Sequence, residues 1–173
     1  MNKPEIITAL RHNHQHFINY MTALSNEDFV AERNSKWTAG QHVDHLIRSI
    51  KPLNQGLMLP GFLLQLIFGK ANRPSKSYNE LVAKYKQKLS QGGMATAAFI
   101  PQTITAAHKE RLLKELHVRS EKLCRTVNGF SETQLDKLIA PHPLLGKVTL
   151  REMLYFTAYH VLHHQELAEK NLA

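Results

Sequence analysis

The chain has 173 residues, 43% of them hydrophobic, which suits one globular domain over residues 1–173 and argues against wholesale disorder. Its formal net charge of +8 would suit an anionic partner such as nucleic acid. The basic residues are scattered, however, the densest cluster being Lys84–Lys88, and no nucleic-acid motif accompanies them, so we expect no such partner.

Helical periodicity runs through the chain, and no segment alternates strongly enough to predict a strand. Residue patterns typical of a capping box mark four helix starts, at Thr38, Ser77, Ser131 and Thr149, and Asn2 followed by Pro4 and Glu5 indicates a fifth. We therefore predict four long helices, at about 3–24, 38–55, 104–128 and 149–171. The third carries the only cysteine, Cys124, which we expect to be buried, and a single thiol fits a reducing, cytoplasmic location.

A crossover of about 48 residues separates the second and third long helices, and a connection of that length needs structure of its own. We place short helices in it near 57–68 and 77–90. The uncharged stretch 53–69 is interrupted by Pro60 and Gly61 and is too short to span a bilayer, so no membrane partner is expected. The predicted fold class is all-α, a four-helix bundle with one long crossover.

The last helix carries three histidines close together. On a helical wheel His160 and His164 lie inside the apolar arc one turn apart, while His163 lies at its edge and Arg151 and Glu152 lie on the opposite, polar arc. Two imidazoles at i and i+4 on one face can bind a single metal ion. The alternative is a pair of core histidines that hydrogen-bond to other groups.

Two other helices carry histidines that could join them. In the first helix, His12 and His16 have the same spacing but lie beside the apolar face, so we expect a partly solvated pair, with His14 at the boundary. In the second helix, His42 and His45 both lie at the margin of the apolar face, and the wheel does not choose between them.

Two segments resemble the DinB-like or YfiT-like family of four-helix metalloproteins. The first, WTAGQHVDHLI, is similar to the family pattern at Trp37, Thr38, Gln41, His45 and Leu46. The second, HPLLGKVTLREMLYFTAYHVLHHQEL, is similar to it at His142, Pro143, Gly146, Thr149, Leu150, His160 and His164.

The resemblance implies an up-down-down-up bundle, a metal ion held by His45, His160 and His164, and a homodimer. His42, which replaces the usual aliphatic residue, and His163 depart from the family pattern. Because His42 shares a stripe with His45 and His163 borders the inward pair, we expect both near the site without being obligatory ligands. Some relatives are transferases that use low-molecular-weight thiols, and others are labelled metal-dependent hydrolases.

Three neutral imidazoles leave a coordination position open, as in a catalytic site. They suit one divalent ion, with Zn or Ni preferred and Fe, Co or Mn as alternatives. If the ion activates a thiol, the protein is a thiol transferase with a small-molecule substrate, and if it activates a water molecule, the protein is a hydrolase. If it activates neither, the protein is a non-catalytic stress-response module. No catalytic or cofactor-binding side chain beyond the ligands is assigned: Glu166 lies on the polar arc, and Asp44 is either beside the site or solvated.

Overall fold

The computed structural model describes residues 1–33 and 35–173, which are mostly helical. The helices are α1 (Lys3–Ala23), α2 (Asn26–Val30), α3 (Ala39–Gly56), α4 (Gly61–Phe68), α5 (Tyr78–Ser90), α6 (Lys109–Asn128), α7 (Glu132–Lys137) and α8 (Leu150–Leu172). Two 3-10 turns, η1 (Ala97–Phe99) and η2 (Ala106–His108), lie between α5 and α6. The two strands β1 (Ile139–His142) and β2 (Gly146–Thr149) form an antiparallel hairpin before α8.

The predicted helix starts are confirmed by hydrogen bonds. All five starts have a capping box, including the one at Asn2: the N-cap side chain accepts from the backbone nitrogen three residues later, and the side chain of that residue accepts from the N-cap backbone nitrogen. The four long predicted helices are α1, α3, α6 and α8, and the two short ones in the crossover are α4 and α5. The largest boundary difference is at α6, which begins at Lys109 because residues 106–108 form the η2 turn instead.

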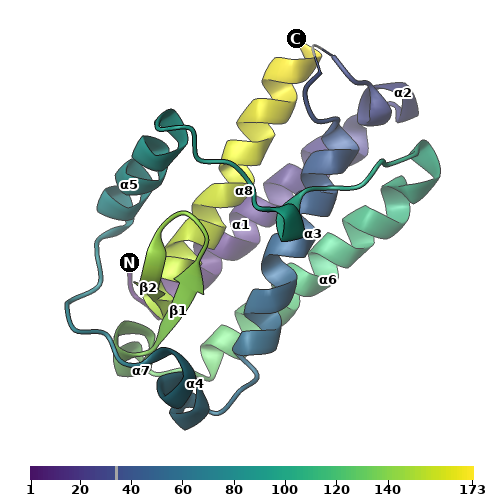
Figure 1. Ribbon diagram of the computed structural model, residues 1–173. Coiled ribbons are helices and arrows are strands. Elements are labelled where there is room, and N and C mark those ends of the chain that lie inside the picture. The colour runs from purple at the N-terminus through teal and green to yellow at the C-terminus, as the bar shows by residue number, and fades with distance from the viewer. Residues whose placement is uncertain (34) are drawn as a thin grey trace.

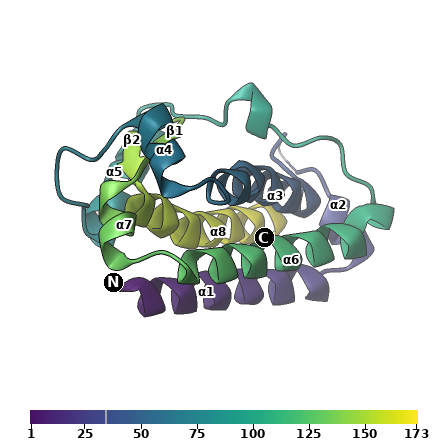
Figure 2. The same cartoon turned by 90° about the horizontal axis from the view of Figure 1, so that it is seen from below.

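The four long helices run alongside one another, as Figures 1 and 2 show. Helix α1 packs on α6 and α8, and α3 packs on the same two helices. Hydrogen bonds between the helices give their directions. Helix α1 is antiparallel to α6, since Lys3 bonds to Asn128 and Lys109 to Thr22. It is parallel to α8, since Asn13 bonds to Ala158 and His16 to Gln165, whereas α3 is antiparallel to α8, since His42 contacts His164 and His45 contacts His160.

The hairpin is a correction to the sequence prediction, which contained no strand. Its strands have four residues each, and Ile139 pairs with Thr149 and His142 with Gly146. Gly146 has a φ of 74°, which is costly for other residues and lets the chain reverse here. The turn brings the chain directly to Thr149, the N-cap of α8, so the hairpin fixes where that helix begins.

The first half of α8 is enclosed on every side. Every residue from Leu150 to Val161 is buried, since α5, α7 and the hairpin cover the face that α1 and α3 leave open. The polar arc predicted for this helix is therefore wrong for its first turn, where Arg151 and Glu152 are buried, and holds only near the C-terminus, where Glu166 is exposed.

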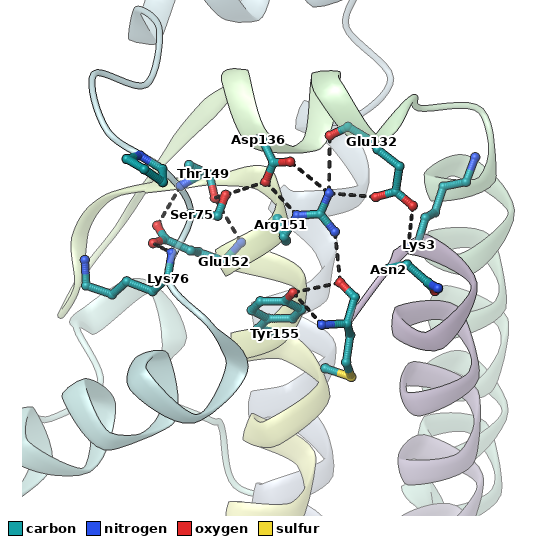
Figure 3. Close-up of polar contacts among 12 residues, drawn as sticks. Asn2, Lys3, Ser75, Lys76, Glu132, Asp136, Thr149, Arg151, Glu152 and Tyr155 are labelled. Atoms are coloured by element: carbon teal, nitrogen blue, oxygen red, sulfur yellow. Dashed lines mark hydrogen bonds and ion pairs between the residues drawn. The ribbon is translucent and has the colours of Figure 1, made fainter.

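Arg151 and Glu152 are buried because other chain segments supply their partners (Figure 3). The Arg151 guanidinium donates to Asp136 and Glu132 at 2.6 Å each. The Glu152 carboxylate accepts two hydrogen bonds from Arg73, at 2.6 and 2.8 Å. These contacts attach α7 and the crossover to the start of α8. Nowhere in the described residues is a helix both long and apolar enough to cross a membrane.

Candidate metal centre

Three histidines from two antiparallel helices meet at mid-height between α3 and α8. His45 comes from α3, and His160 and His164 come from α8, one turn apart. The Nε2 atom of His160 lies 3.3 Å from that of His45 and 2.9 Å from that of His164. All three side chains are buried, and their ligand atoms lie within 4.8 Å of one another.

The outer nitrogens of two of these rings are held by other groups. His45 Nδ1 donates to the carbonyl oxygen of Phe99 at 2.7 Å, which leaves a lone pair on its Nε2. His164 Nδ1 lies 2.8 Å from His42 Nδ1. The ring of His160 stacks on that of Phe156, with 4.5 Å between centroids. The rings are therefore oriented before any ligand binds.

The three inner nitrogens cannot satisfy one another by hydrogen bonds alone. Each ring nitrogen carries at most one proton, and that of His45 is on Nδ1. If His160 Nε2 carries no proton, its lone pair faces that of His45, and if it carries one, a single N–H must serve both neighbours. A cation would accept all three lone pairs. Tetrahedral Zn²⁺ with bonds of about 2.05 Å separates its nitrogen ligands by about 3.3 Å, close to the spacing here.

Burial keeps this cluster uncharged. It lowers the pKa of His160 and His164 well below 6.5 and lowers that of His45, although the Phe99 carbonyl and Asp44 partly offset the shift at His45. The pKa of His42 falls to about 3, chiefly through burial. Neutral imidazole is the form that binds metal, so the site needs little or no proton release at neutral pH.

The structure separates the other histidines as predicted, with one exception. His12 and His16 are exposed on α1 and lie outside the cluster. His163 is half-buried, with its ring centroid 5.2 Å from that of His164, and lies outside the cluster of three. The exception is His14, expected at the boundary: it is buried, and its Nε2 has no hydrogen-bond partner among the described residues.

Asp44 has a structural role beside the site. Its carboxylate accepts from Arg48 at 2.7 Å and from the backbone nitrogen of Gln102 at 3.1 Å. Gln102 lies in the segment after η1, whose Phe99 carbonyl holds His45. The sequence could not reveal the Phe99 contact, because a backbone carbonyl leaves no residue signature. Trp37, quoted only as part of a motif, lies with its ring 5.0 Å from that of His45.

The histidines border a large cavity of about 1300 Å³. Its walls come from α3, α4, α5, α8, the hairpin turn and the segment around η1. The volume exceeds the roughly 300–1000 Å³ typical of a site for one small molecule. The cluster of His45, His160 and His164, which could hold a metal ion, therefore lies next to a cavity large enough for substrates.

The comparison with known families agrees with this geometry. A family model described as the DinB superfamily matches residues 9–168, nearly the whole chain and all of the residues that form the histidine cluster. No curated protein matches the chain.

Proposed function

The chain belongs to the DinB superfamily, and from that premise we propose that it is a metal-dependent transferase that joins a low-molecular-weight thiol to a small electrophile. The observation that carries the proposal is the convergence of the Nε2 atoms of His45, His160 and His164 at the wall of a large cavity. We interpret residues 1–173 as one domain, an up-down-down-up four-helix bundle. The directions of α1, α3, α6 and α8 support this interpretation.

We propose His45, His160 and His164 as the ligands of one divalent ion. An all-nitrogen set suits Zn or Ni, with Fe, Co or Mn as alternatives. When bound, the ion would supply Lewis acidity at an open coordination position and lower the pKa of a thiol placed there. The homodimer implied by the family resemblance remains a prediction.

The protein's own groups would position and shield the reactants. The Phe99 carbonyl and His42 hold His45 and His164 with their inner nitrogens directed at one point. Trp37 covers this end of the cavity, with its ring 6.1 Å from that of His164 and nearly parallel to it. Fixed donors in a site of low polarity need no reorganisation when the reactants arrive.

The cavity lining favours a transferase over a hydrolase. Of the described residues that line it, none is an Asp or Glu that could act as general base toward water, and the HExxH motif is absent from the sequence. A thiol, with a free pKa of about 8.5, needs less help to ionise than water does. The same lack of a carboxylate base keeps a non-catalytic metal-binding module as the second candidate.

The test compares metal-loaded and chelator-treated protein on two substrate panels. One pairs cellular thiols with epoxides and aryl halides, and the other contains esters and amides. We expect metal-dependent turnover on the thiol panel near neutral pH. Turnover only with esters or amides would establish a hydrolase, and firm metal binding with no turnover on either panel would establish the non-catalytic module.

A further inference from the structure

The cavity extends well beyond the histidines along the two helices that carry them. Leu57, the C-cap residue of α3, lies twelve residues after His45, which is about 18 Å along the helix axis. Leu150 lies ten residues before His160 on the antiparallel α8, about 15 Å in the same direction. Both residues line the cavity, so it is elongated and extends well past the histidines in this direction, while Asn171, about 10 Å beyond His164 along α8, lines its opposite end.

The two ends differ in chemistry. The histidine end contains imidazoles, the indole of Trp37, the amide of Asn171 and the ammonium group of Lys36. The far end is lined by apolar side chains from α3, α4, β1 and α8, among them Leu53, Leu64, Phe68, Ala140 and Met153. Several of these are only partly buried, which leaves apolar surface facing the cavity.

The cavity carries almost no charge, although the protein as a whole is strongly basic. Lys36 is the one Lys, Arg, Asp or Glu among the described lining residues. A charged group at the far end would lose its hydration without gaining a partner.

We propose that the far end of the cavity binds the apolar body of an uncharged, elongated substrate, and that the reactive head of this substrate lies at the histidines. The assignment of this substrate as the electrophile rests on the function proposed above, whereas its binding does not. With a terminal epoxide, the thiol sulfur bonds to the terminal carbon, the C–O bond breaks, and the oxygen takes the proton that the thiol releases.

The binding test uses metal-free protein and 1-alkanols from butanol to octanol, followed by titration calorimetry. We expect one site per chain, with affinity rising up to about fourfold for each added methylene, the gain for full burial of that group. A negative heat-capacity change should accompany binding, because apolar surface is buried. Affinity that does not depend on chain length would overturn the proposal.

Matched substitutions locate the site. Leu53→Gln places an amide in the wall of the far end and should weaken octanol binding about tenfold. Leu66→Gln makes the same change on the outer face of α4, where the side chain is 79% exposed and outside the cavity lining, and should have no effect. If Leu53→Gln does not fold, Phe68→Gln at the end of α4 replaces it. Equal effects at the inner and outer positions would also overturn the proposal.

Kinetics then separate the two proposals. In metal-loaded protein, 1,2-epoxyalkanes should show a KM that falls with chain length, and Leu53→Gln should raise KM with little change in kcat. Chain-length-dependent alkanol binding without thiol transfer would leave the apolar site standing and overturn the transferase. If thiol transfer occurs at a rate independent of chain length and alkanol affinity does not depend on chain length either, the transferase stands and the apolar site is overturned.

Discussion

The Nδ1 atom of His42 lies 2.8 Å from the Nδ1 atom of His164, so one proton is shared between the two rings. If His164 offers its Nε2 lone pair to a metal ion, its own proton must be on Nδ1 and must be donated to His42. His42 then holds the ring and tautomer of His164, as an outer hydrogen-bond acceptor commonly does for a metal-bound histidine. Its other nitrogen, Nε2, is buried without a partner among the described residues.

We predict that His42→Ala weakens metal binding by about 10–100-fold without abolishing it, because His164 loses the group that orients it. Chelator competition with Co²⁺ or Zn²⁺ measures the affinity. His163→Ala should leave it unchanged, since His163 lies outside the ligand group. Complete loss of metal on His42→Ala would make His42 a ligand, and unchanged affinity would exclude the positioning role.

The ligand assignment itself is tested by metal content. His160→Ala should remove stoichiometric metal, because His160 Nε2 is the atom that contacts both other inner nitrogens. The double variant His12→Ala, His16→Ala should retain it, because both side chains are exposed on α1. Elemental analysis of protein purified without an affinity tag or a chelating resin gives the result. Metal retained in the first and lost in the second would show that the assignment is wrong.

Local sequence signals were sufficient for much of the fold and for part of the site. Each capping box joins residues three apart, so the sequence alone contains both partners, and the four predicted boxes formed together with a fifth at Asn2. The inward direction of His160 and His164 follows from the periodicity of one helix. The choice of His45 came from family resemblance, because a wheel shows His42 and His45 at the same margin and both side chains are buried in the structure.

What could not be predicted depends on groups distant in sequence. The burial of Glu152 depends on Arg73, which lies 79 residues away, and a helical wheel treats each helix in isolation. The hairpin was not predicted because four-residue strands that contain Pro141 and Gly146 show little alternation of apolar and polar residues. His14 was misplaced for the same reason as Glu152: its position at the edge of the apolar face of α1 does not reveal that other elements cover it.

The contacts of Arg151 should contribute strongly to stability. Its side chain is 10% exposed and binds Asp136, Glu132 and the Met1 carbonyl, joining α7 and the N-terminus to α8. We expect Arg151→Ala to lower the free energy of unfolding by about 2–3 kcal/mol, less than for a fully buried pair because the carboxylates keep part of their hydration.

Arg11→Ala is the matched control. Arg11 also pairs with a carboxylate, that of Glu121, but its side chain is 51% exposed. Because this pair is exposed to solvent, its loss should destabilise the protein clearly less than Arg151→Ala does. Urea unfolding of both variants at neutral pH measures the difference. Equal effects would contradict the role assigned to the contacts in Figure 3.

Two glycines of α3 should respond in opposite directions to alanine. A Cβ at Gly40 would lie 2.7 Å from Ile104 and 2.8 Å from Phe29, closer than packed atoms allow, so Gly40→Ala should destabilise by about 1–3 kcal/mol. A Cβ at Gly56 meets none of the described atoms within 4 Å, and Gly56→Ala should stabilise by up to about 1 kcal/mol. Thermal unfolding of the two variants tests the sign. Destabilisation by Gly56→Ala would contradict the open space at that position.

Buried neutral histidines should make the metal-free protein sensitive to acid, and His14 allows one contribution to be isolated. Burial lowers its pKa to about 4 in the folded protein, against 6.5 in the unfolded chain, so the unfolded state takes up the proton first as the pH falls. Its contribution to stability is complete above pH 6.5 and is lost between pH 6.5 and 4, by roughly 3 kcal/mol in all.

We expect His14→Leu to reduce the loss of stability between pH 7 and pH 5 by about 2 kcal/mol, with the remaining loss due to the other buried histidines. Urea unfolding in the presence of chelator at the two pH values measures this, with His12→Leu at an exposed position of the same helix as the control. A pH dependence as steep in His14→Leu as in the unmodified protein would show that His14 is not buried as a neutral imidazole.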